Sequence, residues 1–161
     1  MASRAVDLLI AYRVIKMLVT PFDKQPAFKM GIIDDKGNVL KKFRTLRTTG
    51  EKQSYTMLHR FVFNLKRILG KVGLGGRLGS FAVAAALLLR ENKNLIQHKE
   101  TIESAVITYL KENNLYEEIL NESREIPEVY TDDKFVMNCF GVDVYESNGE
   151  LKSEFEYAKT L

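Results

Sequence analysis

The segment EKQSYTMLHRFVFNLKRIL, residues 51–69, carries the clearest secondary-structure signal in the chain. Its apolar residues recur at spacings of three and four, the period of one face of an α-helix. We therefore expect a helix over 51–69 that packs into the core against a second, nearly all-apolar helix over 80–91. The residues expected to form this contact are Leu58, Val62, Leu65 and Leu69.

Three more helical runs surround this pair. The first covers residues 4–19 and ends at Thr20-Pro21, because a residue before proline is pushed out of the helical region. The others cover about 99–111 and the short stretch LYEEILNE, residues 115–122. Thr48 or Thr49 is a suitable cap for the helix that begins near Glu51.

Two regions favour strands. Apolar runs at 28–33 and 39–43 flank the turn residues 34–38, which predicts a β-hairpin over about 28–43. Residues 135–146 are rich in aromatic and β-branched residues, and Asn148-Gly149 favours a tight turn, so a second hairpin is expected over about 135–158. Because helices and strands are segregated, the predicted fold class is α+β, with a helical core of about four helices and two β-hairpins.

Length and composition are those of one globular domain spanning residues 1–161. Hydrophobic residues make up 45% of the chain and charged residues 28%, and Cys139 is the single cysteine, which excludes an internal disulfide. Asp7, Arg13 and Lys16 interrupt the apolar residues near the N-terminus, so we expect neither a secretory signal nor a membrane span there.

The net charge of +3 conceals two halves of opposite sign. Residues 1–99 contain 19 lysines and arginines against 6 acidic residues, a net charge of +13. Residues 100–161 contain 5 against 15, a net charge of −10. Either the halves pack together and neutralise each other, or they form separate faces that attract partners. The acidic residues expected to form a partner-binding surface are Glu117, Glu118, Glu122 and Glu125.

The helix over 51–69 also presents a basic arc opposite its apolar face. An aromatic residue, Phe63, stands in the middle of this arc, a combination suited to nucleic acid or to an acidic protein surface. The alternative is a solvated face on which Phe63 is covered by another element. The candidate binding residues of the arc are Lys52, Arg60, Phe63, Lys66 and Arg67.

The glycine-rich segment 70–79 matches neither the phosphate-binding loop of nucleotide hydrolases nor the dinucleotide-binding fingerprint. It is interpreted as a connection between helices, with Lys71 and Arg77 as candidate ligands for an anion if its amides bind one. Two histidines and one cysteine with no metal-ligand spacing predict no metal site and no cofactor. No catalytic residue can be assigned, so the sequence favours a protein that is not an enzyme.

Two stretches resemble small proteins of large tailed bacteriophages that belong to the virion or the assembling head: AYRVIKMLVTPFDKQPAFKMGIIDDKGNVLKK, residues 11–42, and EKQSYTMLHRFVFNLKRILGKVGLGG, residues 51–76. The resemblance covers roughly the first 90 residues. It implies a structural or head-assembly protein, located in the virion or the host cytoplasm, that contacts protein neighbours as a homo-oligomer or with other virion proteins. The alternative from another class is a small nucleic-acid-binding protein that uses the basic helix and the glycine-rich loop.

Overall fold

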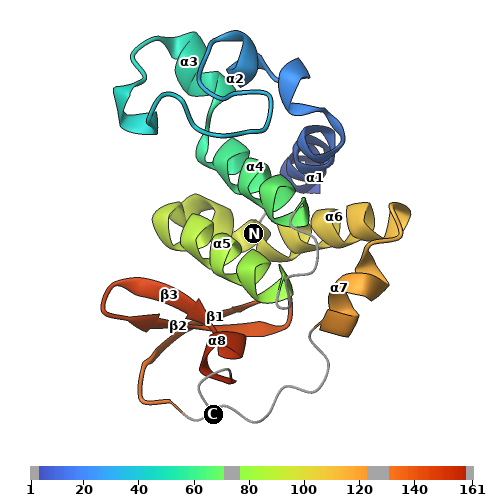
Figure 1. The fold of residues 1–161 in the computed structure, drawn as a ribbon, viewed down its shortest axis with the longest axis vertical. Helices are drawn as coiled ribbons and strands as arrows, with labels where there is room; N and C mark the ends of the chain where they lie inside the picture. The colour runs from blue at the N-terminus through green and yellow to red at the C-terminus, as the bar shows by residue number, and fades with distance from the viewer. Residues whose placement is uncertain (1–3, 71–76, 123–130, 159–161) are drawn as a thin grey trace.

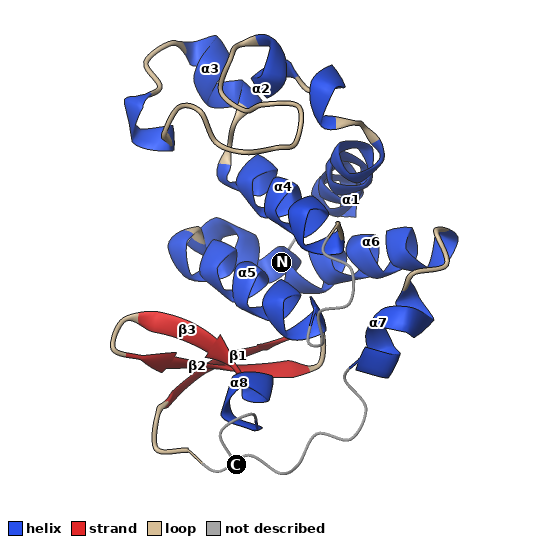
Figure 2. Ribbon diagram, in the orientation of Figure 1, coloured by secondary structure: helices blue, strands red, loops and turns tan. Residues whose placement is uncertain are grey.

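The computed structural model describes residues 4–70, 77–122 and 131–158. In these residues the fold is α+β, as expected, with eight α-helices and one antiparallel sheet of three strands (Figures 1 and 2). The helices are α1 (Arg4–Val19), α2 (Pro26–Lys29), α3 (Thr49–Ser54), α4 (Met57–Leu69), α5 (Arg77–Glu91), α6 (Lys99–Glu112), α7 (Tyr116–Glu122) and α8 (Glu154–Ala158). The strands are β1 (Lys134–Cys139), β2 (Val142–Ser147) and β3 (Glu150–Ser153).

Helix α5 occupies the middle of the molecule (Figure 1). It packs against α4 on one side and against all three strands on the other, while α1 packs on α4 and α6. Small residues along α5 let these elements approach closely: a Cβ atom on Gly79 would lie 2.5 Å from Cδ2 of Phe155. The expectation of a central apolar helix over 80–91 is therefore confirmed, although the helix begins three residues earlier, at Arg77.

The predicted contact between the apolar face of 51–69 and α5 is present. Val62 and Leu65 are fully buried, and Leu58 and Leu69 are partly buried against the same core. The single helix predicted over 51–69 is wrong in one respect, because it is divided into α3 and α4. The side chain of Thr56 accepts a hydrogen bond from the main-chain N–H of His59, which starts a new helix at Met57.

The N-terminal hairpin is the main error of the sequence-based fold. Residues 28 and 29 belong to α2, and strand pairing is limited to one isolated bridge between Ile33 and Val39. The turn between them is present, since the Asp34 carboxylate accepts hydrogen bonds from the main-chain N–H groups of Lys36 and Asn38 at 2.9 and 2.8 Å. The turn alone did not impose strands, because the chain before it closes into the short helix that Pro26 begins.

The C-terminal hairpin is present in enlarged form. Strands β2 and β3 pair around Asn148-Gly149, with Ser147 opposite Glu150, as the turn residues predict. A second tight turn at Phe140-Gly141 adds β1 to the other edge, and the last predicted strand residues form α8 instead. Buried residues of the sheet face α5 and complete the main core.

A smaller core lies at the other end of the molecule, around the connection between α1 and α4. Its buried residues come from the loops and from the outer side of α4, and Phe22 and Phe28 pack against them. The residues are Ala27, Ile32, Ile33, Leu46, Tyr55 and Phe63. This cluster fixes the course of the loops over residues 20–56, which form the top of the molecule in Figure 1.

Candidate functional site: a basic and apolar surface

The structure corrects the expected placement of Phe63. Its side chain is 1% exposed, stacks on Tyr55 and meets the edge of Phe22, with ring centroids 6.1 and 5.7 Å apart. The aromatic residue in the basic arc is therefore covered by the N-terminal loops and is not available to a partner. Burial of such a ring and its aromatic contacts stabilise the fold.

Two basic residues of the arc are engaged by the same loops. The Lys66 ammonium donates hydrogen bonds to the main-chain carbonyls of Met17 and Thr20 and lies 4.3 Å from the ring centroid of Phe22. Burial lowers the pKa of Lys66. Arg67 donates to the carbonyl of Gly37 at 3.0 Å. These side chains hold the loops against α4, so their charges are partly used inside the fold.

The other two cations of the arc do not continue it as one face. The guanidinium of Arg60 lies over the ring of Phe43 at 5.2 Å from its centroid. Lys52 is exposed, but it belongs to α3, which the break at Thr56 separates from α4. The arc predicted from one continuous helix is therefore split between two elements.

Arg77 is the second correction among the candidate residues. Its side chain is 4% exposed, and its guanidinium forms an ion pair with Glu122 at 2.7 Å and another with Glu118 at 3.1 Å. It also donates to the carbonyl of Leu69 at 3.4 Å. Both carboxylates hold the pKa of Arg77 above its usual range. A guanidinium so occupied ties α5 to α7 and is not free to bind an anion.

This network also uses part of the expected acidic surface. Glu118 keeps 58% of its side chain exposed, whereas Glu122 keeps 17%. Glu117 is exposed. Lys71 and Glu125 lie outside the residues that the structure describes.

A basic and apolar surface that the sequence analysis did not identify is formed by residues 36–47, called here the 36–47 surface. The stretch has no acidic residue, and its cations are all exposed. They alternate with exposed apolar side chains, of which Leu40 is 61% and Phe43 38% exposed. One ion pair with the described residues moderates the charge, between Lys41 and Glu51 at 3.7 Å. The cations are Lys36, Lys41, Lys42, Arg44 and Arg47.

Local contacts fix this surface although it contains no strand. The carbonyl of Ile32 accepts hydrogen bonds from the main-chain N–H groups of Leu40 and Lys41 at 2.7 and 3.2 Å. Leu46 anchors the far end in the smaller core. The signal that could have identified the surface is the run of five cations without a carboxylate. The interpretation of residues 39–43 as one strand of a hairpin concealed it.

The exposed carboxylates of the C-terminal part lie at the other end of the molecule. In Figure 1 the 36–47 surface lies near the top, and α7, α8 and the sheet lie in the lower half. Four exposed carboxylates belong to this lower part: Glu117 and Glu118 on α7, Glu150 on β3 and Glu156 on α8. The molecule therefore presents opposite charges near opposite ends of its long axis.

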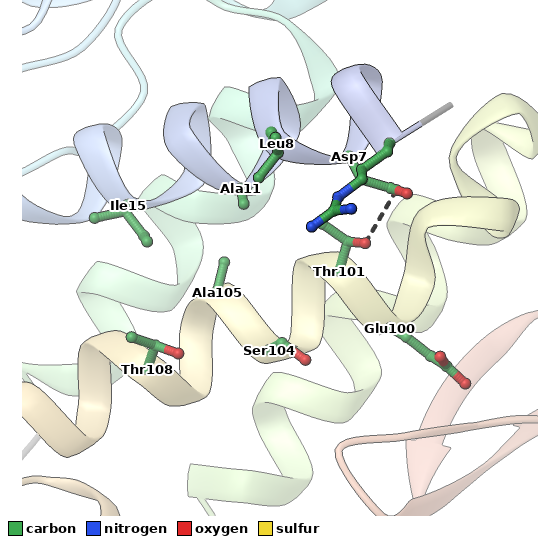
Figure 3. Close-up of a pocket in the computed structure, with 10 residues that line it drawn as sticks. Asp7, Leu8, Ala11, Ile15, Glu100, Thr101, Ser104, Ala105 and Thr108 are labelled. Atoms are coloured by element: carbon green, nitrogen blue, oxygen red, sulfur yellow. Dashed lines mark hydrogen bonds between the residues drawn. The ribbon is translucent and has the colours of Figure 1, made fainter. Parts of the chain in front are cut away.

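A third surface feature is the outer face of α1. Leu8 and Tyr12 are 65% and 60% exposed, although the opposite side of the same helix is buried. Beside them runs a groove of about 440 Å³ between α1 and α6, across which Ala11 and Ala105 approach (Figure 3). At its end the Asp7 carboxylate accepts a hydrogen bond from the hydroxyl of Thr101 and pairs with His98.

Neither metal ligation nor membrane insertion finds support in the part of the chain that the structure describes. No three histidine, cysteine, aspartate or glutamate residues of this part stand close enough together to hold a metal ion. None of its helices is long and apolar enough to cross a bilayer. Comparisons with protein-family models, curated proteins and solved structures found no match to this chain.

Proposed function

We propose that this protein is a structural or head-assembly component of a tailed bacteriophage, present in the virion or the host cytoplasm, and that it is not an enzyme. In this proposal the 36–47 surface binds an acidic protein surface, first of all the C-terminal end of another copy. The observation that carries the proposal is the placement of exposed cations and exposed apolar side chains together, at the end of the molecule away from the exposed carboxylates of α7, α8 and the sheet.

Charge and apolar area make different contributions to the proposed contact. Attraction between unlike surfaces raises the encounter rate and sets the register, while burial of Leu40 and Phe43 supplies affinity. Because the two ends differ, the contact between copies is heterologous and repeats into a ring or an open chain. Repetition of one contact is the geometry that an assembly protein requires.

Sedimentation velocity at about 50 and 500 mM salt tests the proposal, because the screening length falls several-fold over this range. We expect concentration-dependent association that weakens in high salt. The triple variant Lys41→Glu, Lys42→Glu, Arg44→Glu should abolish it. A matched control, Lys29→Glu, Lys93→Glu, Lys134→Glu, makes the same change in net charge at exposed sites elsewhere and should not.

A charge exchange identifies the partner surface. The variant Glu117→Lys, Glu150→Lys should fail to associate with itself and should associate with the triple variant. A wild-type protein that stays monomeric at both salt concentrations contradicts the proposed self-association, and equal loss in the control variant contradicts the assignment to the 36–47 surface.

The second candidate function is nucleic-acid binding. Phe43 among five cations is the observation that favours it, since bases stack on exposed aromatic rings beside a positive groove. Fluorescence anisotropy with a single-stranded oligonucleotide should then show a log affinity that falls with log salt by about 0.7 per phosphate contacted. An anisotropy that does not rise when protein is added at low salt eliminates this candidate.

A further inference from the structure

A wide cleft in the fold is separate from the surfaces discussed so far. It measures about 840 Å³ and lies between the C-terminal part of α1, the start of α2, the start of α4 and the segment after α5. This volume is in the range of sites that bind small molecules, about 300–1,000 Å³. None of the residues of the 36–47 surface lines it.

The charged side chains that line the cleft all carry the same sign. They are Arg13, Lys16 and Lys24, and the described lining residues include no carboxylate. Neither Arg13 nor Lys24 forms an ion pair with the rest of the described chain. The Lys16 ammonium lies over the face of Tyr12, at 5.8 Å from the ring centroid. Three cations without a counter-charge around one cavity create a positive potential inside it.

Two main-chain acceptors beside the cleft are already occupied. The last carbonyls of α1 would repel an anion, since the C-terminal end of a helix carries partial negative charge. Here the carbonyls of Met17 and Thr20 accept hydrogen bonds from the side-chain amide of Gln25 at 3.2 and 3.1 Å and from Lys66. These two carbonyls therefore oppose an anion in the cleft less than free carbonyls would.

His59 adds a neutral donor to the lining. The main-chain N–H of Thr56 donates to Nδ1 of His59 at 3.3 Å, which places the ring proton on Nε2. Burial, together with the positive charge of Arg13, lowers the pKa of His59. The neutral ring can donate from Nε2, and Arg13 lines the same cleft.

Part of the remaining lining is apolar and would contact the body of a ligand, while Gln53, Asn92 and other uncharged polar residues complete the wall. Ile10 and Met17 of α1, with Leu58 of α4 and Leu95, supply this part of the wall. A bare inorganic anion would leave these side chains unused, whereas an uncharged apolar molecule would leave the three cations unpaired. A molecule with both an anionic group and an apolar body would contact the cations and the apolar side chains of the cleft together.

We propose that this cleft binds a small organic anion, in which a phosphate, carboxylate or sulfonate group pairs with Arg13 and Lys24 and an apolar body lies against Ile10, Met17 and Leu58. The site is independent of the proposed assembly function, since it uses different residues on a different part of the surface. Its occupation would reduce the excess positive charge of the N-terminal half.

The probe is anilinonaphthalene sulfonate, an apolar anion whose fluorescence rises on binding. Its uncharged analogue N-phenylnaphthylamine has the same ring system without the sulfonate. We expect the full chain to bind the sulfonate at least about tenfold more tightly than the analogue, because the cations together contribute a charge attraction of that order. Equal affinities for the two probes would overturn the proposal.

Variants locate the probe. Arg13→Gln, Lys24→Gln should weaken binding of the sulfonate about tenfold with an unchanged melting temperature, since both side chains are exposed and unpaired. Lys134→Gln, an exposed lysine on β1, and Leu8→Ser, on the outer face of α1, should leave the affinity unchanged. Loss of binding in Leu8→Ser, with no effect of the double variant, would assign the probe to α1 and refute the site.

Displacement separates the sources of the anionic group. Naphthyl phosphate and naphthoate should each displace the bound probe, and the tighter of the two identifies the preferred head group. Inorganic phosphate alone should displace it only at much higher concentration. Equal displacement by inorganic phosphate would show that the apolar wall contributes nothing and would contradict the proposal.

Discussion

The ion pairs of Arg77 allow a stability effect to be worked out from the structure. The variant Arg77→Met replaces the arginine with an apolar side chain of similar length and so removes the guanidinium. Glu122, whose side chain is 17% exposed, is then left without a cation. Removal of one partner from a buried pair costs about 3–5 kcal/mol. Because Glu122 can regain some water, we expect the lower end, about 3 kcal/mol.

The two carboxylates should not contribute equally. Glu118 is 58% exposed, so its pair with Arg77 resembles a surface ion pair, worth about 0–1 kcal/mol. Urea denaturation of double-mutant cycles measures both couplings. We expect about 2 kcal/mol between Arg77→Met and Glu122→Gln, and below about 1 kcal/mol between Arg77→Met and Glu118→Gln.

A rescue variant separates lost charge pairing from lost packing. In Arg77→Met, Glu122→Leu both charges of the buried pair are gone, so most of the stability should return. If Arg77→Met costs less than about 1 kcal/mol, or if Glu118 couples to Arg77 more strongly than Glu122 does, the reasoning from burial is refuted.

Three further predictions concern the core. Leu65→Ala should lower the free energy of unfolding by about 2–5 kcal/mol in urea, since Leu65 is fully buried, and an unchanged midpoint would contradict its place in the core. Gly79→Ala should lower the free energy of unfolding by about 1–3 kcal/mol despite the better helix propensity of alanine, because the new methyl group meets Phe155. A higher melting temperature of this variant would show that the Phe155 side chain moves aside without cost. Burial raises the pKa of the Cys139 thiol to about 12, so a thiol reagent at about pH 8 should label it in urea and not in the native protein, and rapid native labelling would contradict this.

The longer helices were predictable from the sequence because each depends on a local period, whereas α2, α8 and the break between α3 and α4 were not predicted. Residues 4–19 form α1 with the expected bounds, and Thr48 caps α3 as one of the two expected cap residues. The hairpin over 28–43 failed because Ile32 and Ile33 are buried in a separate core and not in a sheet, while Leu40 and Phe43 are exposed. Alternation of apolar residues cannot distinguish these two ways of burying a loop.

The candidate binding residues also show that a local period does not predict contacts with distant parts of the chain. Phe63 stands opposite the main apolar stripe of α4, and a helical period alone predicts exposure there. The loop residues that cover it begin 41 residues earlier in the chain, at Phe22. Lys66 likewise finds its acceptor at Thr20, 46 positions away. Contacts over such separations follow from the tertiary fold, and one helical wheel carries no information about them.

The division of charge in the sequence is only partly cancelled inside the fold. In the described part of the chain, carboxylates of residues 100–161 pair with three cations of residues 1–99: Arg77, Arg90 and Lys99. Each lies on or beside the central helices, where the two halves of the chain meet. The 36–47 surface lies away from this contact, so internal pairing leaves its charge in place.

Screening by salt should therefore act mainly on contacts between molecules and much less on the fold, because exposed charges are screened and partly buried pairs are protected. A salt titration of the melting temperature beside a salt titration of association distinguishes the two effects: association should weaken over a range in which the melting temperature stays nearly constant. A melting temperature that falls in parallel with association would place the main electrostatic contact inside the molecule.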